Sequence, residues 1–475
     1  MACLGGGAQS VRATGLALGQ ATLPRPAEPS VGRTVTVNLA AAERPMTLPC
    51  FDGQSLPLWT FSDDDWLPTI RLNLGDALDV TFVNRLTRAN EYTSIHWHGI
   101  RLPNDQDGVP YLVQPPVQPG ESYRYRFAPP DTGTFFFHTH CNTAEQLGRG
   151  LVGLLIVDGD TTDPYAADET VFLRDWRIDL EKGSFADFTT TRGANRAGTY
   201  GTVRSANGAG QAEIALPAST DCRLRILNVD PTRIMEIAVD GTEAAVIAVD
   251  GIAVPPFPLE SWLLGPAMRL DLAVRAPAAG APAFIVDRRP GEPLPLVLLA
   301  GTGPAVAVKP FDPLPLRAGR IPEPRIDGAE RLRFDFAQPD AKATVAADDS
   351  LGALLIGSLC LSSNQFWTIN DTSWPGGDHS RIPPPLARLE RGRSYFFSLR
   401  NGTKLIHPIH IHGHSFKVLH SDQRSLPVHH ADTVLLMPEE TVEVAFVADN
   451  PGRWMFHCHV IEHQETGMMG YLEVA

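Results

Sequence analysis

Short runs of β-branched and aromatic residues, either alternating with polar residues or clustered, recur along the whole chain. Clear examples, each bounded by Gly, Pro, Asn or Asp, are residues 80–83, 123–127, 154–157, 269–274 and 441–446. No long segment keeps the apolar period of about 3.6 residues that marks an amphipathic helix. Many short strands at regular spacing are typical of β-sandwiches and small barrels. The pattern therefore predicts an all-β protein.

Two polar, proline-rich connectors divide the chain. The first covers residues 158–164, and the second runs from Lys309 to about Glu330. They leave three β units, at residues 31–158, 170–308 and 331–475. The length of 475 residues agrees with this division, because one domain usually takes roughly 150 residues. We therefore expect three domains in tandem.

Charge and hydropathy exclude two classes of partner. The formal net charge is −14, whereas nucleic acids and anionic membranes attract basic proteins. No run approaches the ~18 uninterrupted apolar residues of a membrane-spanning helix. The first 30 residues look like the remnant of an export segment that has lost its charged start, which predicts a periplasmic or secreted protein. We also expect a monomer.

The first and third units repeat one another. In each, a Gly precedes a His-x-His pair by five residues, and a second Gly follows the pair by eight. A second His-x-His pair, followed directly by Gly, also occurs once in each unit. The matching sets are Gly133, His138, His140 and Gly148 with Gly452, His457, His459 and Gly467, and His96, His98 and Gly99 with His410, His412 and Gly413. A duplicated domain is the simplest account of this agreement.

The histidines are unevenly distributed. The chain has 15 of them, but residues 141–378 contain none. On a strand, residues i and i+2 face the same side, so each His-x-His pair presents two imidazoles in one direction. One such pair is weak support for a metal site, because it is often incidental. Four pairs, placed symmetrically in the two outer units, indicate metal binding.

The C-terminal segment carries a second ligand pattern. Cys458 lies between His457 and His459, His463 follows five residues after Cys458, and Met468 follows five residues later. A thiolate, two imidazoles and a distant thioether form a blue copper site, and His407 would supply the missing imidazole. Zinc also accepts Cys and His, but its structural sites are usually richer in Cys, so copper is favoured. If Cys458 faces one metal site, strand alternation turns its two neighbours toward another.

These four motifs resemble the copper signatures of the multicopper oxidases, the family of laccases, bilirubin oxidases and bacterial cuprous oxidases. The resemblance covers about residues 35–475. It implies three cupredoxin-like Greek-key β-sandwich or barrel domains and four copper ions, namely one type 1, one type 2 and a type 3 pair. It also implies that the His-free middle domain is a spacer without copper.

The resemblance implies a role for each ligand. The type 1 ligands are His407, Cys458, His463 and the axial Met468. The type 2 pair is His96 and His410. The type 3 ligands are His98, His138, His140, His412, His457 and His459. Five histidines fall outside this pattern, namely His379, His414, His420, His429 and His430, of which His414 is expected to matter most.

The family's activity follows from the same resemblance. A small reducing substrate, such as a phenol, an aromatic amine or a metal ion, is expected to dock near His463 and reduce the type 1 copper. Electrons then pass through Cys458 and its two histidine neighbours to the other three coppers, where dioxygen is reduced to water. The expected function is therefore that of a laccase-like oxidase.

Proton delivery needs a carboxylate near the oxygen-reducing coppers. Asp107, eleven residues after His96, matches the family's acidic residue beside the type 2 copper, although an Asp-Gly pair is also a common turn. Several bacterial relatives carry Glu directly after the last type 1 histidine. Here that residue is Gln464, which cannot ionise, and Glu465 follows it. We therefore expect Asp107 or Glu465 to deliver protons.

Two other functions are weighed against the laccase-like one. A metallo-oxidase for Cu(I), Fe(II) or Mn(II) is the main alternative. Soft thioether clusters select Cu(I), and the chain has only eight Met and no Met-rich insert in the third unit, which disfavours a specialised cuprous oxidase. An electron carrier needs only the type 1 ligands and would leave the other eight histidines idle.

The cysteines add little to the prediction. Six are too few for a disulfide scaffold, and none forms Cys-x-x-Cys, which excludes zinc ribbons and thioredoxin-like motifs. Cys141 follows a type 3 histidine and is expected to be a buried free thiol. Pairing among Cys50, Cys141, Cys222 and Cys360 cannot be deduced from the sequence.

Overall fold

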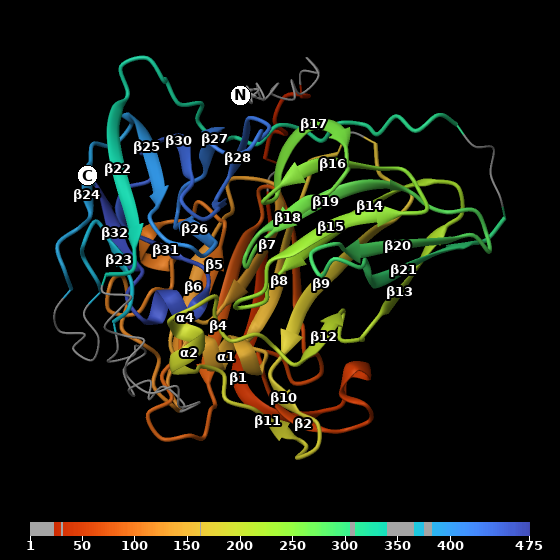
Figure 1. Cartoon of the computed structure of the whole chain (residues 1–475), viewed down its shortest axis with the longest axis horizontal. Helices are drawn as coiled ribbons and strands as arrows, with labels where there is room; N and C mark the ends of the chain where they lie inside the picture. Colours follow the sequence, from red (N-terminus) through yellow and green to blue (C-terminus); the bar gives the residue numbers. More distant parts are fainter. Residues whose placement is uncertain (1–22, 30–31, 162, 305–308, 340–364, 375–381) are drawn as a thin grey trace, which may run out of the picture.

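The computed structural model of the chain describes residues 23–29, 32–161, 163–304, 309–339, 365–374 and 382–475. Strands dominate these residues, so the expected all-β fold is confirmed (Figure 1). Most of the expected export segment lies outside the described residues, as do Cys3, Cys360 and His379. None of the helices in the described part of the chain has the length and apolar character needed to cross a membrane.

The first unit consists of two four-stranded sheets packed face to face. Their strand orders are β2-β1-β4-β6 and β3-β8-β7-β5. A core that includes Phe82, Trp97 and Phe137 fills the space between them. The strands are β1 (Thr34–Met46), β2 (Leu56–Thr60), β3 (Thr69–Asn73), β4 (Ala77–Asn84), β5 (His96–His98), β6 (Ser122–Phe127), β7 (Gly133–His138) and β8 (Val152–Asp158).

The middle unit has a six-stranded sheet, β12-β9-β14-β19-β16-β17, and a five-stranded sheet, β13-β21-β20-β15-β18. A small hairpin of β10 and β11 and the short helix α2 (Thr191–Ala194) extend from it. The strands are β9 (Asp168–Trp176), β10 (Ile178–Asp179), β11 (Ser184–Phe185), β12 (Val203–Ala206), β13 (Ala212–Pro217), β14 (Asp221–Asn228), β15 (Met235–Asp240), β16 (Ala244–Val249), β17 (Ile252–Pro258), β18 (Trp262–Leu264), β19 (Arg269–Arg275), β20 (Pro282–Asp287) and β21 (Leu294–Thr302).

The third unit again has a six-stranded sheet, β23-β22-β25-β30-β27-β28, and a five-stranded sheet, β24-β32-β31-β26-β29. Its strands are β22 (Glu330–Ala337), β23 (Thr368–Ile369), β24 (Ala387–Leu389), β25 (Ser394–Asn401), β26 (His407–Ile411), β27 (Phe416–Ser421), β28 (His429–Ala431), β29 (Thr433–Leu436), β30 (Thr441–Val447), β31 (Gly452–Cys458) and β32 (Met469–Val474). The short helices that the structure describes in the outer units are η1 (Pro49–Phe51), η2 (Asn104–Gln106), α1 (Thr143–Arg149) and α4 (Ile461–Glu465).

The three units share one topology. In the second sheet of each unit a parallel pair is followed by two antiparallel pairs, as in β3-β8-β7-β5, β13-β21-β20-β15 and β24-β32-β31-β26. The first sheets agree in the same way, with antiparallel, parallel and antiparallel pairs in succession. The middle unit therefore has the same architecture although it lacks the histidine motifs. The domain limits 31–158, 170–308 and 331–475 stay a prediction.

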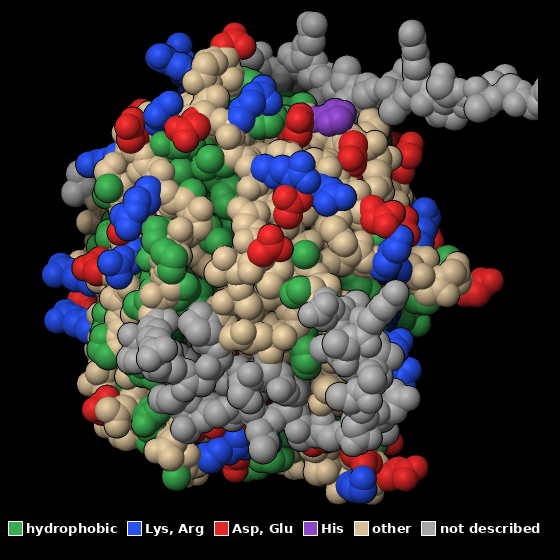
Figure 2. All heavy atoms as spheres, turned by 60° about the vertical axis from the view of Figure 1, so that its left-hand side comes forward, with side chains coloured by type: hydrophobic (Ala, Val, Ile, Leu, Met, Phe, Trp, Pro, Cys, Tyr) green, Lys and Arg blue, Asp and Glu red, His purple; other side chains and the backbone are tan. Residues whose placement is uncertain are grey.

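The surface of the third unit carries both acidic and basic side chains. Figure 2 shows acidic and basic side chains interspersed over this face. Ion pairs of the third unit include Arg388 with Glu473, and Arg393 with Glu330. The negative net charge is therefore not gathered into one patch on this face.

The structure corrects one expectation about cysteine. Cys50, Cys222 and Cys458 are free thiols, but Cys141 is bonded in a disulfide rather than free. A disulfide requires two cysteines whose Cα atoms lie about 5.5 Å apart, and that proximity depends on the folding of distant segments. The position of Cys141 in the sequence therefore could not reveal it.

Candidate metal centre

The four His-x-His pairs lie on or next to strands of the two outer units that face each other. In the first unit β5 and β7 are antiparallel neighbours, and His96 lies opposite His138. In the third unit β26 and β31 repeat the arrangement, and His410 lies opposite His457. Strand alternation turns both imidazoles of a pair toward the other unit. Eight imidazoles therefore meet at one interface.

Imidazole rings from the two units stack across this interface. The ring centroids of His96 and His412 are 3.8 Å apart, and those of His98 and His410 are 3.9 Å apart. His412 Nε2 lies 3.0 Å from His457 Nε2. Three groups have ligand atoms within 4.8 Å of one another: His98, His138 and His459; His140, His412 and His457; and His96, His98 and His410. Each group combines residues from both outer units.

Burial favours the neutral, metal-binding form of seven of these imidazoles. All eight side chains are buried. Burial is the main cause that lowers the pKa of seven of them below the ordinary value, namely His98, His138, His140, His410, His412, His457 and His459. A neutral imidazole retains one free lone pair for a metal ion.

The hydrogen bonds of the rings indicate which nitrogen is free. The Nδ1 atoms of His96, His138 and His410 donate to the backbone carbonyls of Asp107, Thr139 and Asp432, each at 2.8 Å. Such a bond fixes the tautomer and leaves the Nε2 lone pair available. Within the described part of the chain, the following buried ring atoms have no hydrogen-bond partner: Nε2 of His96, His138, His140 and His410, Nδ1 of His98, and both nitrogens of His459. These ring nitrogens are suited to bind copper ions held between the two units.

A separate group of candidate ligands lies within the third unit. His407 begins β26, Cys458 ends β31, and His463 is in α4. Cys458 Sγ is 3.6 Å from Nδ1 of both His407 and His463, and the two Nδ1 atoms are 3.1 Å apart. All three side chains are fully buried, and burial raises the pKa of the Cys458 thiol. A thiolate at this position therefore needs a bound cation, which agrees with a metal ligand.

Met468 closes the loop that follows α4. Its amide donates to the carbonyl of His463 at 2.8 Å, and its own carbonyl accepts from the amide of Cys458 at 3.0 Å. Its side chain is buried in the same hydrophobic core as Cys458. These contacts bring Met468 back beside β31, while its axial role stays a prediction.

The two groups are joined through β31. Cys458 packs in the hydrophobic core of the third unit, whereas His457 and His459 point to the interface with the first unit. The expected alternation therefore exists in the structure. One strand end links the two groups of ligands through directly bonded neighbours.

Asp107 lies between candidate ligands of the two outer units. Its carbonyl accepts from His96, and its Oδ2 accepts from His412 Nδ1 at 2.9 Å. In the described part of the chain its buried Oδ1 has no hydrogen-bond partner. Gly108 has φ +81°, and a Cβ there would overlap the carbonyl of Ile95. The Asp-Gly turn is thus packed against the residue before His96, which holds the carboxylate at the interface.

Glu465 makes different contacts from those of Asp107. It is buried at the N-terminus of α1, where its Oε1 accepts from the amide of Ala144 at 3.0 Å. Burial raises the pKa of Glu465 to about 8, so the carboxyl is largely protonated at neutral pH. The contacts of Glu465 are with α1, whereas those of Asp107 are with two proposed ligands.

Sequence reasoning missed Asp432. Its Oδ1 accepts from His98 Nε2 at 3.1 Å, and its carbonyl accepts from His410. Burial raises its pKa, but the opposing charge of Arg269 prevails and holds the pKa well below the usual range. No motif surrounds Asp432 in the sequence, so only the folded structure identifies it.

The middle unit covers the outer edge of the group around Cys458, which sequence reasoning also missed. His463 Nε2 donates to the carbonyl of Arg196 at 2.5 Å. Glu462 accepts from the amide of Thr190 at 3.0 Å and from the hydroxyl of Thr199 at 2.7 Å. The segment that contains α2 is thereby held against α4, so the middle unit does more than separate its neighbours.

The remaining described histidines lie outside these groups. His414 is buried against Trp454 and donates from Nδ1 to the carbonyl of His412 at 3.3 Å. His420, His429 and His430 are on β27 and β28, outside the ligand groups of the described chain. His414 thus supports the backbone beside a proposed ligand.

Known proteins share both the sequence and the fold of this chain. Models described as multicopper oxidase match residues 46–162, 168–287 and 361–475. The multicopper oxidase MmcO of Mycobacterium tuberculosis is 30% identical over 94% of this chain and 88% of its own length. Laccase-1 of Botryotinia fuckeliana is 29% identical over 88% of this chain and 78% of its own. A crystal structure of a multi-copper oxidase from Pseudomonas thermotolerans is 38% identical, with a TM-score of 0.81, over 94% of this chain and 100% of that one.

Proposed function

We propose that this chain, which belongs to the multicopper oxidase family, oxidises phenols or other aromatic reductants by one electron at a time and reduces dioxygen to water, as a laccase does. Members of this family are copper-dependent oxidoreductases that use oxygen. The observation that carries this proposal is the connection of two buried ligand groups through β31. An electron carrier would need only the group around Cys458.

The proposed copper ligands follow the contacts described above. His407, Cys458, His463 and Met468 would hold the type 1 copper. His96 and His410 would hold the type 2 copper. The type 3 pair would be held by His98, His138 and His459 on one side and by His140, His412 and His457 on the other. When bound, these coppers supply one-electron transfer at the type 1 site and four-electron reduction of dioxygen at the other three.

The residues of the chain contribute orientation, insulation and a proton path. Cys458 and its two neighbours offer electrons a covalent route of a few bonds between the groups. The core around Cys458 excludes water from its sulfur. Asp107 can hold a proton at Oδ1, which accepts no hydrogen bond within the described part of the chain, and pass it to oxygen-derived groups at the interface. Glu465 is the second candidate for this role.

The surroundings of His463 favour an aromatic reductant over a metal ion. A metallo-oxidase for Fe(II) or Mn(II) needs carboxylates that are free to bind the ion beside this histidine, whereas one for Cu(I) needs thioethers. Glu462, the carboxylate next to it, is buried and already accepts hydrogen bonds from Thr190 and Thr199. In this arrangement Glu462 is not available to a metal substrate.

We expect phenols to be better substrates than metal ions. Oxygen uptake with a dimethoxyphenol should give a kcat/KM at least ~10-fold above that with Cu(I), Fe(II) or Mn(II), a ratio within the reach of pocket discrimination. A Cys458→Ser sample serves as the blank, because Cu(I) and Fe(II) also react with oxygen directly. Higher kcat/KM for one of the metal ions would establish the metallo-oxidase function instead.

Metal analysis should find four coppers per chain. His457→Ala should lose type 3 copper and keep the blue colour, since His457 is not among the ligands around Cys458. His420→Ala is the matched control, because the His420 side chain is 62% exposed and belongs to neither ligand group of the described chain. A fully loaded wild type that binds a single copper would favour the electron carrier.

We also propose that the chain works as a monomer in the periplasm or outside the cell. Every proposed copper ligand comes from one chain, so a second copy is not needed to complete a site. The disulfide at Cys141 supports the location, because disulfides persist mainly in oxidising compartments.

A further inference from the structure

The middle unit holds no proposed copper ligand, but it sends a fully buried arginine to the interface of the histidines. Arg269 begins β19. Its Nη1 donates to Asp432 Oδ1 at 2.9 Å, and its Nη2 donates to Asp432 Oδ2 at 2.5 Å. Asp432 lies in the third unit between β28 and β29. The two residues form a bidentate ion pair, the strongest geometry for this kind of contact.

Asp432 also accepts hydrogen bonds from two proposed copper ligands. Its Oδ1 accepts from Nε2 of His98, at 3.1 Å, and its carbonyl accepts from Nδ1 of His410, at 2.8 Å. His98 belongs to the first unit. Arg269 of the middle unit, Asp432 of the third and His98 of the first are therefore joined in one buried chain of hydrogen bonds.

Backbone groups hold both ends of the ion pair in place. Arg269 also donates to the carbonyls of Asp250 and Thr134, at 2.8 and 3.2 Å. The carboxylate of Asp250 accepts from the amides of Asp432 and Thr433, at 3.2 and 3.1 Å, and from the amide of Arg269 at 2.9 Å. Neither side chain of the pair can move without breaking several of these bonds.

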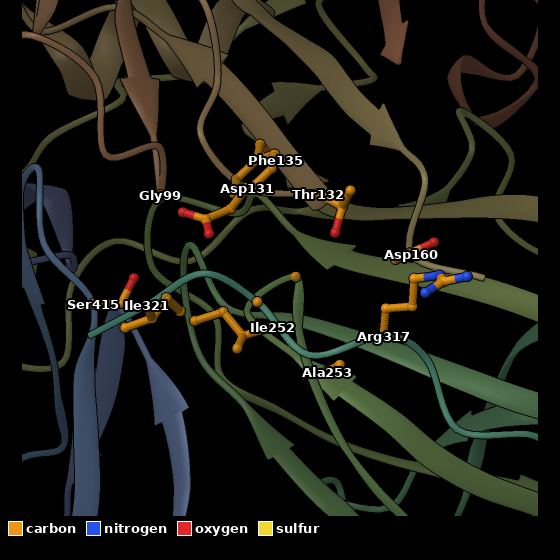
Figure 3. Close-up of a pocket in the computed structure, with 12 residues that line it drawn as sticks. Gly99, Asp131, Thr132, Phe135, Asp160, Ile252, Ala253, Arg317, Ile321 and Ser415 are labelled. Carbon is orange, nitrogen blue, oxygen red and sulfur yellow. The ribbon is translucent and has the colours of Figure 1, made fainter. Parts of the chain in front are cut away.

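Gly99 makes room for the ion pair. It follows His98 directly and has φ +84°, and a Cβ there would overlap Arg269 Nη2 and Asp432 Oδ2. Gly99 also lines a small pocket with residues of all three units, including Phe135, Ile252 and Ser415 (Figure 3). Its volume of about 10 Å³ is close to that of one water position. Arg269 and Asp432 are both buried, so the ion pair is shielded from bulk solvent, which strengthens its electrostatic interactions.

The ring nitrogens of His98 indicate the role of the ion pair between Arg269 and Asp432. In the described part of the chain, Nδ1 of His98 has no hydrogen-bond partner, whereas Nε2 is bonded to Asp432. His96, His138 and His410 show the opposite choice, with Nδ1 bonded and Nε2 free. A carboxylate that accepts from Nε2 keeps the proton on that atom and leaves the Nδ1 lone pair for a metal.

We propose that Arg269 is a positioning residue for the oxygen-reducing coppers: it holds Asp432 in place, and Asp432 directs Nδ1 of His98 and Nε2 of His410 toward the metal. This inference rests on the proposed function, because it takes His98 and His410 as copper ligands. It assigns to the middle unit a part in building the metal centre, in addition to its contact with His463.

The test compares Arg269→Met with Arg269→Lys in the copper-loaded, full-length protein. Arg269→Met keeps the length of the side chain but removes its charge and its donors. The copper content during titration with a chelator, the electron paramagnetic resonance spectrum of type 2 copper and the near-ultraviolet band of the type 3 pair should all be measured. Arg269→Met should hold the copper of the interface ~10–100-fold more weakly, the usual effect of losing an outer partner of a ligand. Its blue colour should persist.

Arg223→Met is the matched control. Arg223 is as buried as Arg269, lies on the neighbouring strand β14, and pairs with Asp160 and Asp271. In the described chain neither carboxylate hydrogen-bonds to a histidine. Arg223→Met should keep the type 2 and type 3 signals. Equal copper loss in both methionine variants would mean that Arg269 only stabilises the fold, which overturns the proposal.

Arg269→Lys keeps the inference testable if Arg269→Met does not fold. Lysine retains the charge but cannot form the bidentate pair, so this variant should bind four coppers with an altered type 2 spectrum. A type 2 spectrum identical to that of the wild type would overturn the proposal. A wild type without type 2 and type 3 copper would instead refute the proposed function itself.

Discussion

Replacing Cys458 by serine will remove the blue colour of the copper-loaded protein and reduce its oxidation of substrates to the background rate. The colour of a type 1 site requires the thiolate, and Cys458 is the only thiol among these ligands. The substitution also replaces the soft sulfur at the start of the covalent route through β31. Both effects should therefore appear together.

The fold of Cys458→Ser should survive. The amide of Val460, which lies 3.4 Å from the sulfur, can donate to the serine hydroxyl, and burying an imperfectly bonded hydroxyl costs about 1–3 kcal/mol. Absorption spectra, substrate oxidation and thermal unfolding measure the three properties. Cys222→Ser is the control, because Cys222 is also a buried free thiol but lies outside the ligand groups. A colourless wild type that carries four coppers would show that the role of Cys458 is assigned wrongly.

Asp107→Asn should separate the reduction of the type 1 copper from the use of oxygen. Asparagine keeps the size of the side chain, and its carbonyl can still accept from His412, but it cannot carry a proton at the position of Oδ1. A positioned acid contributes typically ~10²–10⁴-fold, so steady-state oxygen consumption should fall at least ~10-fold. The blue colour and the anaerobic reduction of type 1 copper should be normal. Reoxidation of the reduced enzyme should slow.

Stopped-flow absorption and an oxygen electrode measure the effects of Asp107→Asn. Asp105→Asn is the matched control, because Asp105 lies two residues away but is exposed. If Asp107→Asn consumes oxygen as the wild type does across the pH range, proton delivery depends on another group. Glu465→Gln is then the next variant to compare.

The fold and the meeting of the histidines could be predicted because both depend on local patterns. Strand alternation alone places His457 and His459 on one side of β31 and Cys458 on the other. The repeat in the first and third units predicts that their motifs occupy equivalent strands. The structure has this arrangement, with His96 opposite His138 and His410 opposite His457.

The contacts of the middle unit could not be predicted in the same way. Arg269 and Asp432 are 163 residues apart, and neither lies in a motif. The carbonyl of Arg196 reaches His463 through its backbone, which any residue could supply. Such contacts arise from the packing of one unit on another, and no periodicity or composition records them. The absence of histidine predicted that the middle unit is a spacer. That prediction describes the unit's lack of copper ligands but not its contacts with the residues of the other two units.

The equal division of the eight imidazoles between the first and third units links copper supply to the lifetime of the molecule. If the two units separate, each carries four of these eight imidazoles and neither retains a complete group of the interface. Copper that binds only while the two units are in contact stabilises that state by mass action. The stabilisation is about 2.7 kcal/mol per site when free copper is 100 times the dissociation constant. Copper shortage therefore increases the fraction of molecules whose units have separated and which proteases can reach, as well as the fraction of molecules without activity. A cell that restricts copper would hold less of this protein.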